Sequence, residues 1–180
     1  MTDSNKSKLL DIARRSIEYY LENKKLLIIK ELVDSILLEE QAVFVTLHKD
    51  GNLRGCIGHM HARMQLYKAV IEMATASAFE DPRFQNIKRN DLDNIKIEIS
   101  VLSPMKKISD YKKIRMGIDG VWIKQGYHSG VYLPRVATDT GWDRDTFLQS
   151  LCSSKAGLPP DAYKDSNCEI YIYQIEKFSE

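Results

Sequence analysis

In the stretch 52–59, which reads NLRGCIGH, Cys56 lies between Gly55 and Gly58 and follows Arg54 by two residues. Side chains alternate along a β-strand, so an extended stretch would present Arg54, Cys56 and Gly58 on one face. A guanidinium close to a thiol favours the thiolate, the nucleophilic form of cysteine. Arg54 and Cys56 are therefore candidate catalytic residues in an electropositive site.

The glycines of this stretch allow two interpretations. Gly55 and Gly58 carry no side chain, so a ligand or another backbone could approach the strand closely. Together with Arg54 they are candidate ligand- or partner-binding residues. In the second interpretation Cys56 is a small buried residue of a sheet, as free cysteines often are, and a structural carboxylate holds Arg54. The residue pattern leaves both interpretations open.

Two histidines follow the cysteine closely. His59 and His61 form an H-x-H pair, and zinc accepts histidine and cysteine ligands. No second cluster with ligand spacing exists, because the remaining cysteines, Cys152 and Cys168, are far from any such pair. We therefore expect no metal and no cofactor, and we keep His59 as a candidate binding residue at the end of the strand.

A carboxylate and an arginine flank a proline in the stretch 77–84, which reads SAFEDPRF. Asp81 and Arg83 could form an arginine–carboxylate fork at the end of a helix. Such a fork would either bind a ligand or partner, or act as an intraloop salt bridge that fixes the chain exit. Asp81 is also a candidate partner for Arg54.

Composition restricts the class of protein. The 180 residues are 43% hydrophobic and 28% charged with a net charge of +1, which is ordinary for a globular protein. Without a basic stripe or a long apolar segment, we expect neither nucleic acid nor a membrane as partner. Three widely spaced cysteines and a polar N-terminus favour a cytoplasmic location. Glycine-rich nucleotide loops and the three-cysteine motif of radical enzymes are absent from the sequence.

Hydrophobic periodicity predicts the elements that position these residues. Asp50-Gly51 predicts a hairpin turn, because both residues tolerate positive φ, and His128 is expected in the turn GYHSG of a second hairpin. The stretch 23–40 reads as a connector. We expect helices over 6–21, 63–79 and 142–152, the last capped by Asp143, and strands over 42–48, 53–58, 95–102 and 168–178. This pattern predicts an α+β fold with a mostly antiparallel sheet flanked by helices.

Five motifs in order resemble the AMMECR family, whose bacterial and archaeal members are called AmmeMemoRadiSam system protein A. The motifs are LRGCIG, SAFEDPRF, ISVLSP, GVWI with LPRVA, and KAGL. The resemblance covers residues 44–173. It implies a single AMMECR-like domain over residues 1–180, built from two interleaved subdomains, the second one smaller, with a cleft between them that the LRGCIG strand lines.

The resemblance also implies companions, namely a Memo-type protein and a radical S-adenosylmethionine enzyme, but no established reaction. It adds Pro134 and Lys155 as candidate cleft residues. The sequence departs from the common family pattern at His59, Arg135 and Tyr163, which puts shared ligand contacts there in doubt.

Three functions follow as alternatives. The first is a component of an AmmeMemoRadiSam-type system whose LRGCIG cleft binds a small ligand or partner segment and uses Cys56 as a thiolate. The second is a non-catalytic adaptor. The third is a stand-alone cysteine-dependent hydrolase or transferase, which needs a histidine base near Cys56. Whether the protein is an enzyme, and its oligomeric state, stay open.

Overall fold

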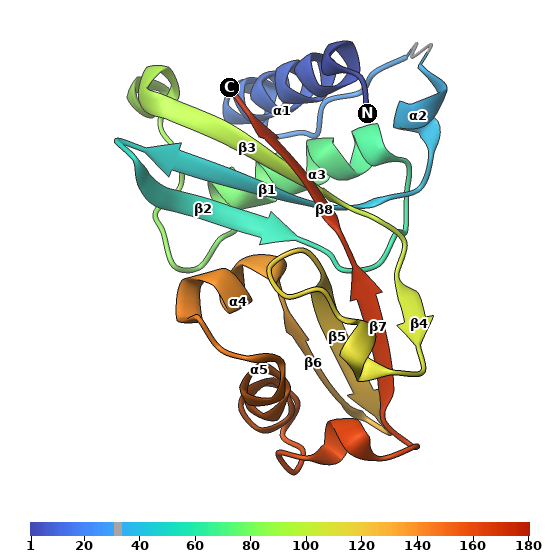
Figure 1. Ribbon diagram of the computed structural model, residues 1–180. Coiled ribbons are helices and arrows are strands. Elements are labelled where there is room, and N and C mark those ends of the chain that lie inside the picture. Colours follow the sequence, from blue (N-terminus) through green and yellow to red (C-terminus); the bar gives the residue numbers. More distant parts are fainter. Residues whose placement is uncertain (31–33) are drawn as a thin grey trace. The chain divides into compact units, whose positions relative to one another are not determined.

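The computed structural model describes residues 1–30 and 34–180. It has an α+β fold with several helices and two separate four-stranded antiparallel sheets (Figure 1). The chain divides into two compact units, one formed by residues 1–102 and 176–180 and the other by residues 103–175. The predicted fold class is confirmed.

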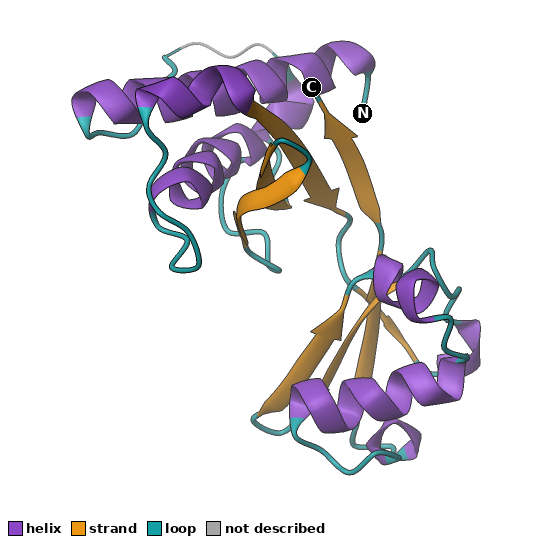
Figure 2. Cartoon of the chain, turned by 90° about the vertical axis from the view of Figure 1, so that its left-hand side faces the viewer, coloured by secondary structure: helices purple, strands orange, loops and turns teal. Residues whose placement is uncertain are grey.

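The first unit packs two long helices against one face of its sheet (Figure 2). Val43, Val45 and Leu47 alternate along one strand and are fully buried on that face. The sheet has the order β2-β1-β3-β8. The elements of the unit are α1 (Asp3–Asn23), α2 (Ser35–Leu38), β1 (Ala42–Lys49), β2 (Asn52–Gly58), α3 (Leu66–Phe79), the 3-10 helix η1 (Arg89–Asn94), β3 (Ile95–Leu102) and β8 (Ile175–Ser179).

The second unit has its own core between a sheet and a layer of short helices. Its sheet has the order β4-β7-β5-β6. The elements are β4 (Lys106–Ile108), the 3-10 helix η2 (Tyr111–Lys113), β5 (Gly120–Gln125), β6 (His128–Tyr132), α4 (Pro134–Thr140), α5 (Arg144–Ser150), the π-helix η3 (Leu151–Ala156), the 3-10 helix η4 (Ala162–Lys164) and β7 (Glu169–Tyr173).

Several local predictions are confirmed with their physical reasons. β1 and β2 form the expected antiparallel hairpin, and Asp50 and Gly51 turn the chain with φ of 51° and 76°. Asp143 caps α5, because its Oδ1 accepts a hydrogen bond from the Thr146 N–H at 2.8 Å.

Other predictions are wrong in detail. The single closing strand over 168–178 is two strands, β7 and β8, which belong to different sheets. The chain changes sheet at Gln174, whose N–H donates to Ser103 Oγ and whose carbonyl accepts from the Ser103 N–H, both at 2.9 Å. His128 lies in β6 rather than in a turn, because a two-residue loop, residues 126–127, closes this hairpin.

The sequence analysis also missed the short elements, namely α4, β4 and the 3-10 helices η1, η2 and η4. The helix α4 begins with Pro134 at its first turn, a position that proline favours, and the three-residue strand β4 is too short to show periodicity. In the expected connector over 23–40 the structure contains the short helix α2, while residues 31–33 lie outside the described residues.

Candidate functional site

Cys56 lies in β2, at the edge of the first sheet. It is half-buried, whereas Cys152 and Cys168 are buried in the second unit, where burial raises the pKa of both thiols, that of Cys168 to about 11. Cys56 pairs with Thr46 of β1, and the Thr46 hydroxyl donates a hydrogen bond to Cys56 Sγ at 3.3 Å. Cys56 is therefore the most accessible of the three thiols.

Asp81 and Arg83 hold the backbone of Cys56 from the segment that follows α3. Asp81 Oδ2 accepts from the Cys56 N–H at 2.9 Å, and Arg83 Nη2 donates to the Cys56 carbonyl at 3.2 Å. The two side chains form a fork, with Nε–Oδ1 at 2.9 Å and Nη2–Oδ2 at 2.7 Å. This confirms the expected fork in the DPR turn. It also protects the open edge of β2 at this residue.

The fork has clear electrostatic consequences. The hydrogen bonds from the Arg83 side chain, helped by the Cys56 and Arg83 N–H groups, hold the pKa of Asp81 well below its usual range despite the burial of the carboxylate. Asp81 in turn raises the pKa of Arg83, and the charge of an ionised Cys56 contributes in the same direction. The guanidinium that contacts Cys56 is that of Arg83, and the contact is with the backbone carbonyl.

Arg54 does not follow the simple alternation that the sequence analysis assumed. The register shifts between β1 and β2, so that Leu47 pairs with Gly55 and His48 with Leu53. Arg54 lies in the resulting bulge, where alternation along the strand is broken. Shared orientation with Cys56 therefore no longer follows from the sequence, and a role for Arg54 in activating Cys56 stays a prediction.

The carboxylate near Arg54 is Asp91 rather than Asp81. Lys49 Nζ contacts Asp91 at 2.6 Å and is the main cause of the lowered pKa of Asp91, to which Arg54 adds a smaller electrostatic contribution. Within the described part of the chain, the buried Nη1 of Arg54 has no hydrogen-bond partner.

The chain itself fills the space beside both glycines of LRGCIG. A Cβ on Gly55 would lie 2.1 Å from the backbone oxygen of Ser77 in α3, so this glycine lets the helix lie directly on the strand. A Cβ on Gly58 would lie 2.3 Å from the ring of Phe44. Both glycines therefore have a packing role, and their role in ligand binding stays a prediction.

Ser77 joins α3 to the hairpin at the same place. Its hydroxyl accepts a hydrogen bond from the Ile57 N–H at 2.9 Å and donates one to the Val45 carbonyl at 2.8 Å. Ser77 is buried, so these bonds have no competition from water. The residues on both sides of Cys56 are thus fixed to the helix that precedes Asp81.

A row of polar side chains crosses the first sheet on the face opposite the buried valines of β1. Thr46 pairs with Cys56 on one side and with Glu98 of β3 on the other, and paired residues share a face. Glu98 Oε2 lies 2.8 Å from Lys177 Nζ of β8. We call Cys56, Thr46, Glu98 and Lys177 the polar row.

Sequence reasoning missed three members of the polar row. Thr46, Glu98 and Lys177 are far apart in the chain, and only the strand register brings them to Cys56. The available signal was the alternation of polar with apolar residues, which involves Thr46 and His48 in the first strand and Lys96, Glu98 and Ser100 in the second. His48 has the same parity as Thr46 and belongs to the same face.

The chain is similar to known proteins over both units. The AMMECR1 family model matches residues 10–178. The chain belongs to the AMMECR1 family. A relative from Methanothermobacter thermautotrophicus is 42% identical over 178 residues, covering 96% of this chain and 92% of the relative. The AMMECR1-family chain is also similar to the crystal structure of an uncharacterised protein from Pyrococcus horikoshii, with a TM-score of 0.82, 38% identity, and coverage of 96% of this chain and 90% of that one.

The remaining candidates of the AMMECR1 motifs lie in both units. His59 follows β2 in the first unit, and its two ring nitrogens are buried without a hydrogen-bond partner among the described residues. Pro134 and Lys155 belong to the second unit, in α4 and η3, and Lys155 Nζ lies 5.9 Å from the centre of the Tyr132 ring. Their binding roles stay predictions, as does the cleft.

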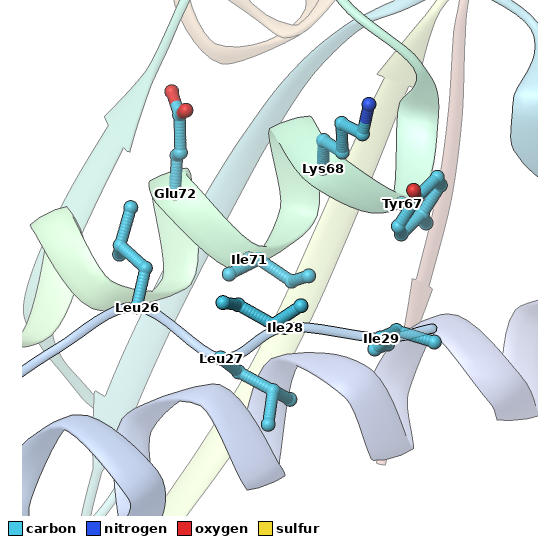
Figure 3. A pocket seen from close by; sticks show the side chains of 8 residues that line it. All are labelled: Leu26, Leu27, Ile28, Ile29, Tyr67, Lys68, Ile71 and Glu72. Carbon is cyan, nitrogen blue, oxygen red and sulfur yellow. The ribbon is translucent and has the colours of Figure 1, made fainter. Parts of the chain in front are cut away.

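An apolar pocket of the first unit contains none of these candidates. It has a volume of about 270 Å³ and is formed by the segment 26–29 and by α3 (Figure 3). Ile28 lies close to Ile71, while Lys68 and Glu72 extend away from the apolar side chains in Figure 3. The pocket therefore offers mainly apolar contact, with the polar groups of Tyr67, Lys68 and Glu72 among its lining residues.

Residues 1–30 and 34–180 contain neither a cluster of metal ligands nor a membrane-spanning helix. No three histidine, cysteine, aspartate or glutamate side chains there lie together as metal ligands would. No described helix combines the length and the apolar character that a bilayer crossing requires.

Proposed function

We propose that this AMMECR1-family chain is a component of an AmmeMemoRadiSam-type system, and that its functional surface is the face of the first sheet that carries Cys56. The observation that supports the proposal most is the combination at this one thiol. Cys56 is half-buried, receives the Thr46 hydroxyl at its sulfur and lies beside the Arg83 guanidinium. A hydrogen-bond donor at the sulfur would stabilise negative charge that develops there during a reaction, and the Arg83 guanidinium, although paired with Asp81, adds a nearby cation.

The proposed companions are a Memo-type protein and a radical S-adenosylmethionine enzyme, as the family resemblance implies. In this role the protein binds a small ligand or a partner segment at the Cys56 face. If Cys56 reacts with the bound group, the protein is an enzyme. If Cys56 only contributes to binding, the protein is an adaptor. A stand-alone hydrolase is less well supported, because it needs a base bonded to the thiol, whereas the hydrogen-bond partner of Cys56 Sγ is the hydroxyl of Thr46.

Brief alkylation followed by mass spectrometry tests the thiol. We expect Cys56 to be labelled faster than Cys152 and Cys168 at neutral pH, and Arg83→Gln to slow this labelling. Arg115→Gln is the matched control, because Arg115 forms the same kind of fork with a buried carboxylate, Asp119, in the second unit. Labelling of Cys56 at or below the rate of the buried cysteines would refute a reactive thiol.

Co-purification tests the system. The protein is expressed with the Memo-type protein and the radical enzyme of the same genome, as wild type, Cys56→Ser and Cys168→Ser. Capture of the companions by wild type and Cys168→Ser supports the proposal. Unchanged capture by Cys56→Ser, together with an inert thiol, would favour the adaptor. Failure of every variant to capture either companion would contradict membership of the system.

A further inference from the structure

We infer that Lys177 is a positioning residue for Cys56, because it binds Glu98 and so leaves the Thr46 hydroxyl proton to the sulfur. This inference rests on the proposed function, in which Cys56 is a reactive thiol. It concerns only residues of the first unit, all of them in the polar row.

The first step is a competition for a single proton. A threonine hydroxyl has one hydrogen to donate. Thr46 lies on the central strand β1, with Cys56 opposite it on β2 and Glu98 opposite it on β3. Side chains directly opposite each other have their Cβ atoms about 4.5–5.5 Å apart, so both the sulfur and the carboxylate are potential acceptors. In the structure the proton goes to the sulfur, at 3.3 Å.

The second step concerns which of the two acceptors the Thr46 hydroxyl prefers. Sulfur is a weak acceptor, whereas an ionised carboxylate is a strong one. A free Glu98 carboxylate would therefore win the Thr46 proton. Its negative charge near Cys56 would also disfavour the thiolate. A bond to sulfur is therefore the outcome expected when the Glu98 carboxylate is held elsewhere.

The third step identifies what holds Glu98. Lys177 approaches from β8, on the side of β3 away from β1, and its Nζ lies 2.8 Å from Glu98 Oε2. The Glu98 side chain is 19% exposed and that of Lys177 56%. As a stability element such a partly exposed pair is worth little. The direction of the ion pair matters more, since Lys177 draws the Glu98 carboxylate away from Thr46.

The labelling rate of Cys56 as a function of pH tests the inference. Thr46→Val removes the donor and keeps the side-chain shape, whereas Thr46→Ser keeps the hydroxyl. Lys177→Met frees Glu98, and Lys177→Arg keeps the cation. Lys96→Met is the matched control, because Lys96 is an exposed lysine on the same face of β3, paired with His48. The double variant Lys177→Met with Glu98→Gln removes both the cation and the competing acceptor.

We expect Thr46→Val and Lys177→Met to move the midpoint of the labelling curve to higher pH. A displacement of about one pH unit makes labelling at pH 7 about tenfold slower. Thr46→Ser, Lys177→Arg and Lys96→Met should stay close to wild type, and Glu98→Gln should restore the rate of Lys177→Met. A merely structural lysine would change the melting temperature without moving the pH curve.

The outcomes separate this inference from the proposed function. Fast wild-type labelling that Lys177→Met changes no more than Lys96→Met overturns the inference and leaves the reactive thiol in place. Slow wild-type labelling that still falls in Thr46→Val and Lys177→Met, and recovers with Glu98→Gln, supports the inference while the reactive thiol fails. Persistence of the Lys177→Met defect in the double variant also overturns it.

Discussion

Replacement of Asp81 by asparagine tests how the DPR turn holds Cys56. The Asp81 side chain is 1% exposed and accepts hydrogen bonds from the Cys56 N–H, the Arg83 N–H and the Arg83 guanidinium. Breaking a buried ion pair costs about 3–5 kcal/mol. The Arg83 side chain is 55% exposed and can turn to water, which lowers the cost. We therefore expect Asp81→Asn to lower the free energy of unfolding by about 2–3 kcal/mol at pH 7.

The difference in the free energy of unfolding between wild type and Asp81→Asn depends on pH through the pKa of Asp81. Because its pKa in the folded protein lies well below the usual range, the charged carboxylate stabilises the fold fully above the unfolded-state pKa of about 3.9. This contribution is lost as the pH falls from there through the folded-state pKa. The difference between wild type and Asp81→Asn should therefore be complete at pH 7 and smaller at pH 3.

Two probes allow the units to be followed separately. Both tryptophans, Trp122 and Trp142, belong to the second unit, so their fluorescence reports on that unit. Unfolding of the first unit in urea is monitored by the hydrogen exchange of the β2 amides. Asp119→Asn is the matched control, since Asp119 is also buried and bound to an exposed arginine. It should shift the fluorescence transition and leave β2 unchanged. Equal stability of Asp81→Asn and wild type, or a difference that is the same at pH 3, would refute the reasoning.

Three further substitutions have expected outcomes. Gly55→Ala should lower the free energy of unfolding by about 1–3 kcal/mol, because its Cβ would meet the Ser77 carbonyl; thermal unfolding checks this, with the exposed Asn52→Ala as control. Ser77→Ala should lower the free energy of unfolding by about 1–3 kcal/mol and speed hydrogen exchange of the Ile57 amide. Unchanged exchange would contradict a Ser77 hydroxyl that joins Ile57 of β2 to Val45 of β1. Asp143→Ala should destabilise α5 by about 0.5–2 kcal/mol, seen as an earlier fluorescence transition of the second unit, whereas an unchanged transition would show that the cap contributes nothing.

Local features of the fold were predictable because their causes are local. The Asp50-Gly51 turn and the Asp143 cap depend on one or two residues and their neighbours. The change of sheet at Gln174 was not predictable, because nothing in the stretch 168–178 interrupts its strand pattern. The break is imposed by pairing with Ser103, about seventy residues earlier.

In the candidate site, too, the local features were predictable from the sequence and the features set by strand pairing were not. The fork of Asp81 and Arg83 spans three residues and was visible in the sequence. The role of Arg54 as the cation beside Cys56 rested on uninterrupted alternation and stays a prediction, because a bulge is set by strand pairing rather than by the strand itself. Thr46 and Glu98 could be assigned to Cys56 only from the register of three strands.

The order in which the two units appear along the chain constrains how the protein forms on the ribosome. The second unit is one continuous stretch, residues 103–175, whereas the first is completed only by residues 176–180. Until residues 176–180 emerge, β3 has an unpaired edge, and Ile97 lacks Glu180, whose side-chain carboxylate accepts from the Ile97 N–H and whose backbone N–H donates to the Ile97 carbonyl. Exposed edges of this kind invite wrong pairing between chains. The second unit can therefore fold on the nascent chain before the sheet of the first unit is complete, and the Lys177 that binds Glu98 emerges only with β8.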